Sequence, residues 1–219
     1  MLNDEKQYHI QLKKGDVGKY VLLPGDPGRC EPIAALFDNP VHVATNREYN
    51  TYTGYLDGVK VSVTSTGIGC PSAAIALEEL VRVGADTFIR VGTSGHIQPD
   101  SVSGELAIIS AAIRDEGTSK HYMPIEFPAV ADIDLVMAIK RAAEKNKARY
   151  RIGITQSKDS FYGQHEPERM GVASELLNRW KAWEIGGAIC SEMEASALFV
   201  IASMLRVRAG GVMMVHAKE

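Results

Sequence analysis

The sequence has few cysteines, almost no excess of charge of one sign and no long apolar run. Its 24 Lys and Arg against 27 Asp and Glu leave a formal net charge of −3 over 219 residues. Such a balance provides no global positive field to hold a nucleic acid. No apolar run reaches the roughly 18 residues that a membrane helix needs, and the first residues, MLNDEKQYHIQLKKGD, contain no apolar signal core. We expect a protein that neither binds nucleic acid nor crosses a membrane.

The cysteines Cys30, Cys70 and Cys190 are odd in number, widely spaced and form no C-x-x-C pair. A disulfide framework is therefore excluded, and a reducing compartment, the cytoplasm, is expected. The remaining composition, with 45% hydrophobic and 23% charged residues, is that of an ordinary globular protein. At this length one hydrophobic core buries surface more efficiently than two. The chain is expected to form a single domain over residues 1–219.

Short apolar runs alternate with segments of helical periodicity, which is typical of a layered α/β domain. The expected strands are 20–23, 41–44, 51–56, 60–64, 87–91, 106–113, 152–156, 188–190 and 211–215. The expected helices are 31–37, 71–83, 132–146, 175–184 and 194–205. The dipeptide Asp57-Gly58 predicts a hairpin, so the central sheet flanked by helices should be mixed.

Glycine and arginine recur near strand ends. Gly25-Asp26-Pro27-Gly28-Arg29 follows the first strand, the segment 90–95 ends a later one, and Arg47 precedes the hairpin. Glycines there let backbone N–H groups approach an anion, and arginine suits bidentate phosphate contacts. Each loop alone is also explained as a tight turn with a surface arginine, but their agreement favours a small oxyanion site. The pattern G-x-x-x-x-G-K-[ST] is absent, so ATP binding has no motif support.

Two further segments carry polar groups suited to a ligand. Ser191-Glu192-Met193-Glu194 lies where a strand enters a helix, and its carboxylates would accept hydrogen bonds from a sugar diol. The alternative is that acidic residues favour the positive end of a helix. The segment 159–169 combines adjacent aromatics with an amide and a guanidinium, which suits a stacked planar heterocycle, although a core aromatic beside a polar loop also explains it.

The six histidines form no H-E-x-x-H or other close grouping, which argues against a catalytic zinc.

In this order, the glycine and arginine loops, the Glu-Met-Glu and the aromatic loop resemble the nucleoside phosphorylase family, and within it the uridine phosphorylases. The strings that carry the resemblance are VLLPGDPGRCEPIA, TNREYNTYTG, STGIGCPSAAIALEEL, FIRVGTSGHIQP, PIEFPAVAD, DSFYGQHEPER and SEMEASALF. They extend over most of the chain, from about His9 to Val215. The resemblance implies a nucleoside-phosphorylase-like α/β fold.

The resemblance also implies the site residues. Phosphate would be bound by Gly25, Arg29, Arg90 and Thr93, together with Arg47 of the partner subunit. Ribose would be bound by Glu192, Met193 and Glu194, with Thr93 nearby and His9 of the partner subunit at the 5′-hydroxyl. The base would contact Phe161, Gln164 and Arg169. Catalysis would depend on Arg29, Arg90, Thr93 and Glu194.

No cofactor is implied beyond phosphate as co-substrate. Some members of the family hold a monovalent cation such as K⁺, and the matching positions are Glu48, Ile68 and Ser72. A hexamer built as a trimer of dimers is implied as well. The family continues past its last strand with an Arg-bearing loop and a closing helix, so a C-terminal loop and helix are expected to be missing from residues 1–219.

The implied activity is that of a pentosyltransferase: reversible phosphorolysis of uridine to uracil and α-D-ribose 1-phosphate, in pyrimidine nucleoside salvage. Gln164 and Arg169 match the polar edge of uracil and favour it over a purine, but purine nucleoside phosphorylase is the nearest alternative. Nucleosidases of the same fold use water and do not need an arginine set. A non-catalytic nucleoside-binding module is the alternative from another class.

Overall fold

The computed structural model describes residues 5–218, so residues 1–4 and 219 of the expected domain lie outside the described residues. The strands are β1 (Tyr20–Leu23), β2 (Asp38–Asn46), β3 (Tyr49–Leu56), β4 (Val59–Thr64), β5 (Thr87–His96), β6 (Leu106–Asp115), β7 (Ala129–Val130), β8 (Tyr150–Lys158), β9 (Cys190–Glu192) and β10 (Arg208–Lys218). The α-helices are α1 (Cys30–Ala34), α2 (Cys70–Arg82), α3 (Ile133–Lys145), α4 (Phe161–His165), α5 (Ala173–Ile185) and α6 (Ala195–Leu205). Short 3₁₀ helices are η1 (Pro27–Arg29), η2 (Thr118–His121) and η3 (Pro167–Arg169).

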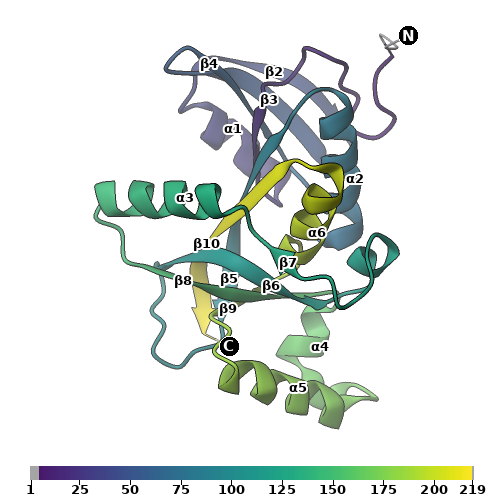
Figure 1. Ribbon diagram of the computed structural model, residues 1–219, viewed down its shortest axis with the longest axis vertical. Helices are drawn as coiled ribbons and strands as arrows, with labels where there is room; N and C mark the ends of the chain where they lie inside the picture. Colours follow the sequence, from purple (N-terminus) through teal and green to yellow (C-terminus); the bar gives the residue numbers. More distant parts are fainter. Residues whose placement is uncertain (1–4, 219) are drawn as a thin grey trace.

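The strands form one sheet in the order β10-β6-β8-β9-β5-β1-β4-β3-β2, with β7 beside β6 (Figure 1). Because β10 also pairs with β5, the strands β5, β10, β6, β8 and β9 form a closed ring. Parallel pairs such as β1 with β5 combine with antiparallel pairs such as β6 with β10. The expected α/β class, with a central mixed sheet flanked by helices, is confirmed.

The hairpin predicted from Asp57-Gly58 joins β3 to β4. The φ angles of Asp57 and Gly58 are 49° and 78°, and positive values at both positions are what a two-residue hairpin turn requires. Leu56 and Val59 pair on either side of the turn. The local sequence therefore determines the register of this pair of strands.

β5 is longer than the sequence indicates. The predicted strand ends at Val91 with a loop over 92–95, but β5 continues to His96. The reason is tertiary: β10 pairs with β5 from Thr87 to His96, and β9 pairs with its last residues. The glycines in this segment therefore lie in a strand, and Thr93 stands on a supported backbone.

Several other elements have different bounds from those predicted, among them β2, β9 and β10, and β7 was not predicted. Two segments differ in kind. The helix expected over 31–37 ends at Ala34, and Phe37 beyond it packs into a small core cluster with Cys30. The segment 159–169, expected as a loop, contains α4 and η3. Ser160 begins α4 because its hydroxyl accepts a hydrogen bond from the backbone N–H of Gly163 at 2.9 Å.

Helices cover both faces of the sheet. α2 and α6 pack together on the face that contains Ile109 and Met213, and this is the main core. α3 covers Ile108 and Val212 on the opposite face (Figure 1). Every residue of α6 from Ala195 to Ala202 is buried, as expected for a helix that is apolar around most of its circumference.

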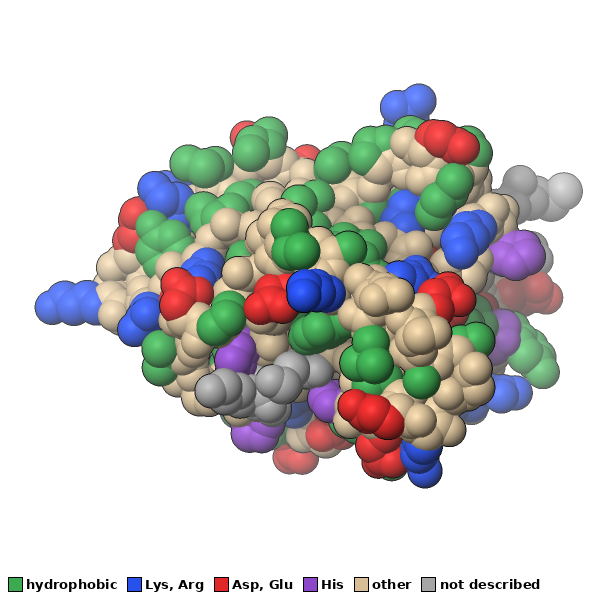
Figure 2. Space-filling view, turned by 90° about the horizontal axis from the view of Figure 1, so that it is seen from below, with side chains coloured by type: hydrophobic (Ala, Val, Ile, Leu, Met, Phe, Trp, Pro, Cys, Tyr) green, Lys and Arg blue, Asp and Glu red, His purple; other side chains and the backbone are tan. Residues whose placement is uncertain are grey.

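The molecular surface carries mixed charge. On the face shown in Figure 2, basic and acidic side chains are interspersed with apolar ones, with no continuous basic patch among the described residues. No helix in the part of the chain that the structure describes has the length and apolar character to cross a membrane.

A substitution in α6 tests the assignment of the main core. Phe199 is 1% exposed, and replacing it with Ala should lower the free energy of unfolding by about 3–5 kcal/mol, because apolar contacts are lost and a cavity remains. Met204 of the same helix is 38% exposed, and Met204→Ala should cost less than about 1 kcal/mol. Urea unfolding of the two variants measures the difference, and equal losses would contradict this assignment.

Candidate active site

A cavity of about 780 Å³ opens where several strands end. β1 is followed by Gly25, β5 provides Thr93 to Gly95 near its end, and β8 ends at Lys158. In α/β proteins, whether the strands form a barrel or an open sheet, ligands collect at the carboxyl ends of the strands. The other lining residues come mainly from the turn after β4, from α4 and from the β9–α6 junction: Asp26, Pro27, Arg29, Gly67, Ile68, Arg90, Phe161, Tyr162, His165, Ser191, Glu192, Met193, Glu194 and His216.

A buried ion pair lies in the wall of this cavity. The Arg90 guanidinium contacts the Glu194 carboxylate, and both side chains are at most 5% exposed. Arg90 also donates to the carbonyl of Leu23 at 3.2 Å, while Glu194 accepts from the backbone N–H of Gly69 at 2.7 Å. The Nε of Arg90 has no hydrogen-bond partner among the described residues. The guanidinium is therefore fixed in place in the wall of the cavity.

A second guanidinium lies beside the first. Burial, and then the positive charge of Arg90, lower the pKa of Arg29. A guanidinium whose pKa is lowered by a neighbouring cation favours a bound anion that offsets the paired positive charge. Gly25 leaves room for it, since a Cβ there would lie 3.3 Å from Nη1 of Arg90. This part of the cavity is suited to a small oxyanion.

The β9–α6 junction places two carboxylates together. Glu192 accepts from the Ser157 hydroxyl and from the backbone N–H groups of Glu194 and Ala195, at 2.8 and 2.9 Å. Burial, and then the charge of Glu194, raise the pKa of Glu192. A carboxylate has about four acceptor positions, so the three bonds leave room for a ligand hydroxyl.

An aromatic wall is formed by α4. The rings of Phe161 and His165 lie 4.1 Å apart, and both residues line the cavity with Tyr162. These side chains are exposed, so a flat ligand could cover them.

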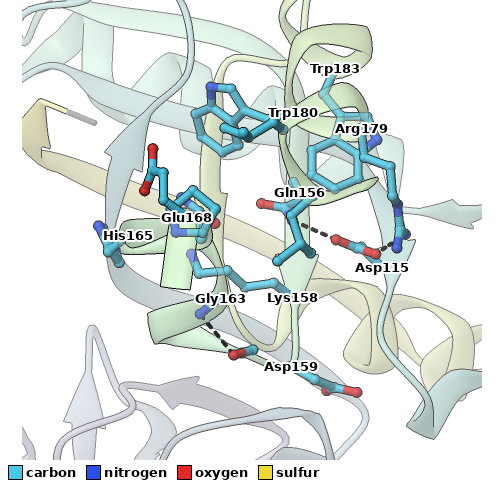
Figure 3. A pocket seen from close by; sticks show the side chains of 15 residues that line it. Asp115, Gln156, Lys158, Asp159, Gly163, His165, Glu168, Arg179, Trp180 and Trp183 are labelled. Carbon is cyan, nitrogen blue, oxygen red and sulfur yellow. Dashed lines mark hydrogen bonds and ion pairs between the residues drawn. The ribbon is translucent and has the colours of Figure 1, made fainter. Parts of the chain in front are cut away.

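A second cavity of about 580 Å³ lies between the end of β8, α4 and α5, and it shares Lys158 and His165 with the first (Figure 3). Gln164 lines this second cavity. On its far wall Gln156 donates to Asp115 at 2.7 Å, and Arg179 forms an ion pair with the same carboxylate. Burial raises the pKa of Asp115.

The structure brings together most of the residues predicted from the sequence. The members of the predicted set that line the first cavity are Gly25, Arg29, Arg90, Thr93, Phe161, Glu192, Met193 and Glu194. Gln164 lies on the adjoining cavity, and its amide oxygen contacts the Ser191 hydroxyl at 2.7 Å. Their roles toward a ligand stay predictions.

Three of the residues predicted to contact phosphate, ribose or base do not line either cavity. Arg169 is 59% exposed, pairs with Glu166 at 2.7 Å and lies over the Tyr162 ring. His9 contacts Glu79 at 2.7 Å through Nδ1. Arg47 is exposed in the turn between β2 and β3, with a φ of 53°.

The positions matched to a monovalent cation lie near the cavity rim. The Ser72 hydroxyl donates to the Glu48 carboxylate at 2.7 Å, and this bond lowers the pKa of Glu48. Ile68 is exposed and lines the cavity. A carboxylate and a hydroxyl suit a cation that prefers oxygen ligands, so these residues fit K⁺, which stays a prediction. Among the described residues, no three His, Cys, Asp or Glu side chains gather as metal ligands.

Sequence reasoning missed Lys158 as a lining residue. The expected strand ends at Gln156, whereas β8 continues through Lys158. A lysine at the end of an otherwise buried segment, directly before an aromatic-rich loop, is the signal that would have identified it.

A cavity at the ends of strands, with paired arginines beside two buried carboxylates, has the chemistry that suits a small anion together with a hydroxylated ligand. Comparison with known proteins is more specific. A family model described as the phosphorylase superfamily matches residues 19–219, and the chain belongs to this family.

Similar proteins carry related names. A uridine phosphorylase of Treponema pallidum is 55% identical over 213 residues, which is 97% of this chain and 83% of the relative. A uridine phosphorylase of Thermococcus kodakarensis is 50% identical over 97% of this chain and 78% of its own length. A guanosine phosphorylase of Halorubrum lacusprofundi is 41% identical over 94% of this chain and 81% of its own.

The anion site can be tested without a substrate. Inorganic phosphate at about 100 times its Kd should stabilise the protein by about 2.7 kcal/mol, measured by thermal unfolding against chloride at equal ionic strength. Arg29→Met should weaken phosphate binding about tenfold or more, because one charged hydrogen bond is lost. Arg141→Met, an exposed position on α3, serves as the control and should leave binding unchanged. An unchanged Kd in Arg29→Met would contradict this site.

Proposed function

We propose that this protein is a uridine phosphorylase, a pentosyltransferase that reversibly converts uridine and phosphate to uracil and α-D-ribose 1-phosphate in nucleoside salvage. The observation that carries the proposal is the convergence of Arg29 and Arg90 with Glu192 and Glu194 on one cavity. The names of the relatives at 55% and 50% identity support uridine as the substrate.

The geometry supports each partner of this reaction. Phosphate lies between Arg29 and Arg90, with Gly25 and Thr93 at its sides, and needs no cofactor. Glu192, Met193 and Glu194 hold the ribose, whose hydroxyls donate to the carboxylates. As the glycosidic bond lengthens, positive charge develops on the ribose ring, and phosphate beneath C1′ stabilises that charge before bonding to the same carbon. The base stacks on Phe161 of the α4 wall.

An oxo-purine nucleoside is the second candidate substrate, because one relative at 41% identity is a guanosine phosphorylase. The phosphate and ribose groups serve either base equally. A nucleoside-binding protein without turnover is the remaining alternative.

The proposal includes shared sites in an oligomer, with a hexamer of three dimers as its form. Arg47 and His9 do not line the cavity of their own chain, so contacts with a neighbouring chain's substrate would explain their predicted roles. We place the protein in the cytoplasm, in keeping with three buried cysteines that form no disulfide.

An assay of uridine, thymidine and inosine, each with and without phosphate, tests the activity. Uracil should be released from uridine only when phosphate is present. Arg90→Ala should lower kcat by roughly 10²-fold or more and raise the KM for phosphate, because the buried guanidinium positions that anion. Phosphate-dependent release of hypoxanthine alone would favour the purine alternative, and tight nucleoside binding without turnover would favour the binding protein.

Mixing two inactive variants tests the shared site. If Arg47 acts in a neighbouring chain's site, coexpressed Arg47→Ala and Arg90→Ala chains should form some sites with both arginines intact. Random pairing restores about a quarter of the sites in a symmetric dimer. The recovered activity is measured against each variant alone. Activity no higher than the sum of the separate variants would show that Arg47 does not act across chains.

A further inference from the structure

The end of β8 carries an unusual side chain for a protein interior. Lys158 is 5% exposed and is the only buried lysine among the residues whose side chains the structure describes. It lines both cavities, and in Figure 3 it extends from its strand toward the side where His165 lies. As a lining residue of both cavities, Lys158 offers an ammonium group that a ligand in either cavity could contact.

Its hydrogen bonds connect it to the predicted base-binding residues. The Lys158 ammonium donates to the Ser191 hydroxyl at 2.6 Å. The same hydroxyl faces the amide oxygens of Gln156 and Gln164, at 2.6 and 2.7 Å, and it can donate its one hydrogen to only one of them at a time. Gln156 also donates to Asp115. The network therefore holds the side chains of Gln156, Gln164 and Ser191 in place behind α4.

Lys158 also provides a positive charge beside the predicted base-binding residue Gln164. Arg169, which the sequence suggests for base recognition, is half-exposed, paired with Glu166 and outside both cavities. An ammonium has three donor positions and no acceptor. It therefore favours a ligand atom that carries lone pairs or negative charge, and it disfavours an amino group.

Resting on the proposed function, we infer that Lys158 donates a hydrogen bond to the carbonyl oxygen O4 of uracil and stabilises the base as it leaves. In this step the C1′–N1 bond breaks and its electron pair goes to N1, while a phosphate oxygen forms the new bond to C1′. The resulting negative charge spreads onto the carbonyl oxygens of uracil, which the ammonium neutralises without losing a proton. The released base anion takes its proton from water.

The inference also explains which bases the site accepts. Uracil and the oxo-purines present carbonyl oxygens, whereas cytosine presents an amino group where uracil has O4. Lys158 would therefore make the protein select oxo bases, which fits relatives named for uridine and for guanosine.

Lys158→Met tests the inference, because the loss of rate should depend on how stable the leaving base is as an anion. Phosphorolysis of uridine is compared with that of 5-fluorouridine, whose fluorine already stabilises the departing anion. Lys158→Met should lower kcat for uridine by roughly 10²-fold and for 5-fluorouridine by only about tenfold, with the KM for phosphate unchanged. The preference for uridine over cytidine, as kcat/KM, should fall about tenfold. Lys145→Met, at an exposed position on α3, is the control.

Equal losses for both nucleosides would overturn the inference and indicate a structural role, while leaving the proposed function intact. Uridine turnover that is absent from the unmodified protein would overturn both. Lys158→Gln, which keeps a neutral donor near Ser191, gives the same comparison if Lys158→Met does not fold. A further test needs no variant. Comparable phosphorolysis of cytidine and uridine by the unmodified protein would contradict recognition of the base by an ammonium group, which can only donate hydrogen bonds.

Discussion

The buried ion pair between Arg90 and Glu194 joins the central strand β5 to the start of α6, and the cavity is arranged around it. Glu194 also accepts the backbone N–H of Gly69, so the beginning of α2 is held at the same point. Removing one member of a buried pair costs about 3–5 kcal/mol because the other charge stays uncompensated. Two helices and a strand thus share one electrostatic anchor, and the anion and hydroxyl sites cannot shift independently.

Charge changes sign along the proposed substrate. In the proposed complex, the lining arginines contact the phosphate, the carboxylates contact the ribose, and Lys158 contacts the base. In the proposed reaction, the first partner is an anion, the sugar becomes positive and the base leaves negative. Each fixed charge therefore opposes the charge that its part of the substrate carries or develops, and little rearrangement is needed when the bond breaks.

Local sequence was sufficient where short-range chemistry decides the structure. Asp57-Gly58 predicts its hairpin, because a two-residue turn depends on the φ angles of its own residues. The anion site that the glycine loop before Arg29 indicates stays a prediction. It was insufficient where distant strands decide the outcome. The extension of β5 through Gly92 depends on pairing with β10, more than a hundred residues later. Lys158 was missed for a similar reason, because its burial follows from α4 and β9 packing around it. Arg169 has the right chemistry for the base, but its ion pair with Glu166 holds it at the surface.

The closed ring of strands has a consequence for association. Each strand of the ring has a neighbour on both sides. Among the described residues, β2 is the long strand at the edge of the sheet, and it pairs with β3 alone. An unpaired strand edge is a template for adding further chains. β2 is a poor template: Pro40 lacks a backbone donor, and irregular register interrupts its pairing near Val41 and Ala44. The edge that the fold leaves open is thereby protected against edge-to-edge aggregation.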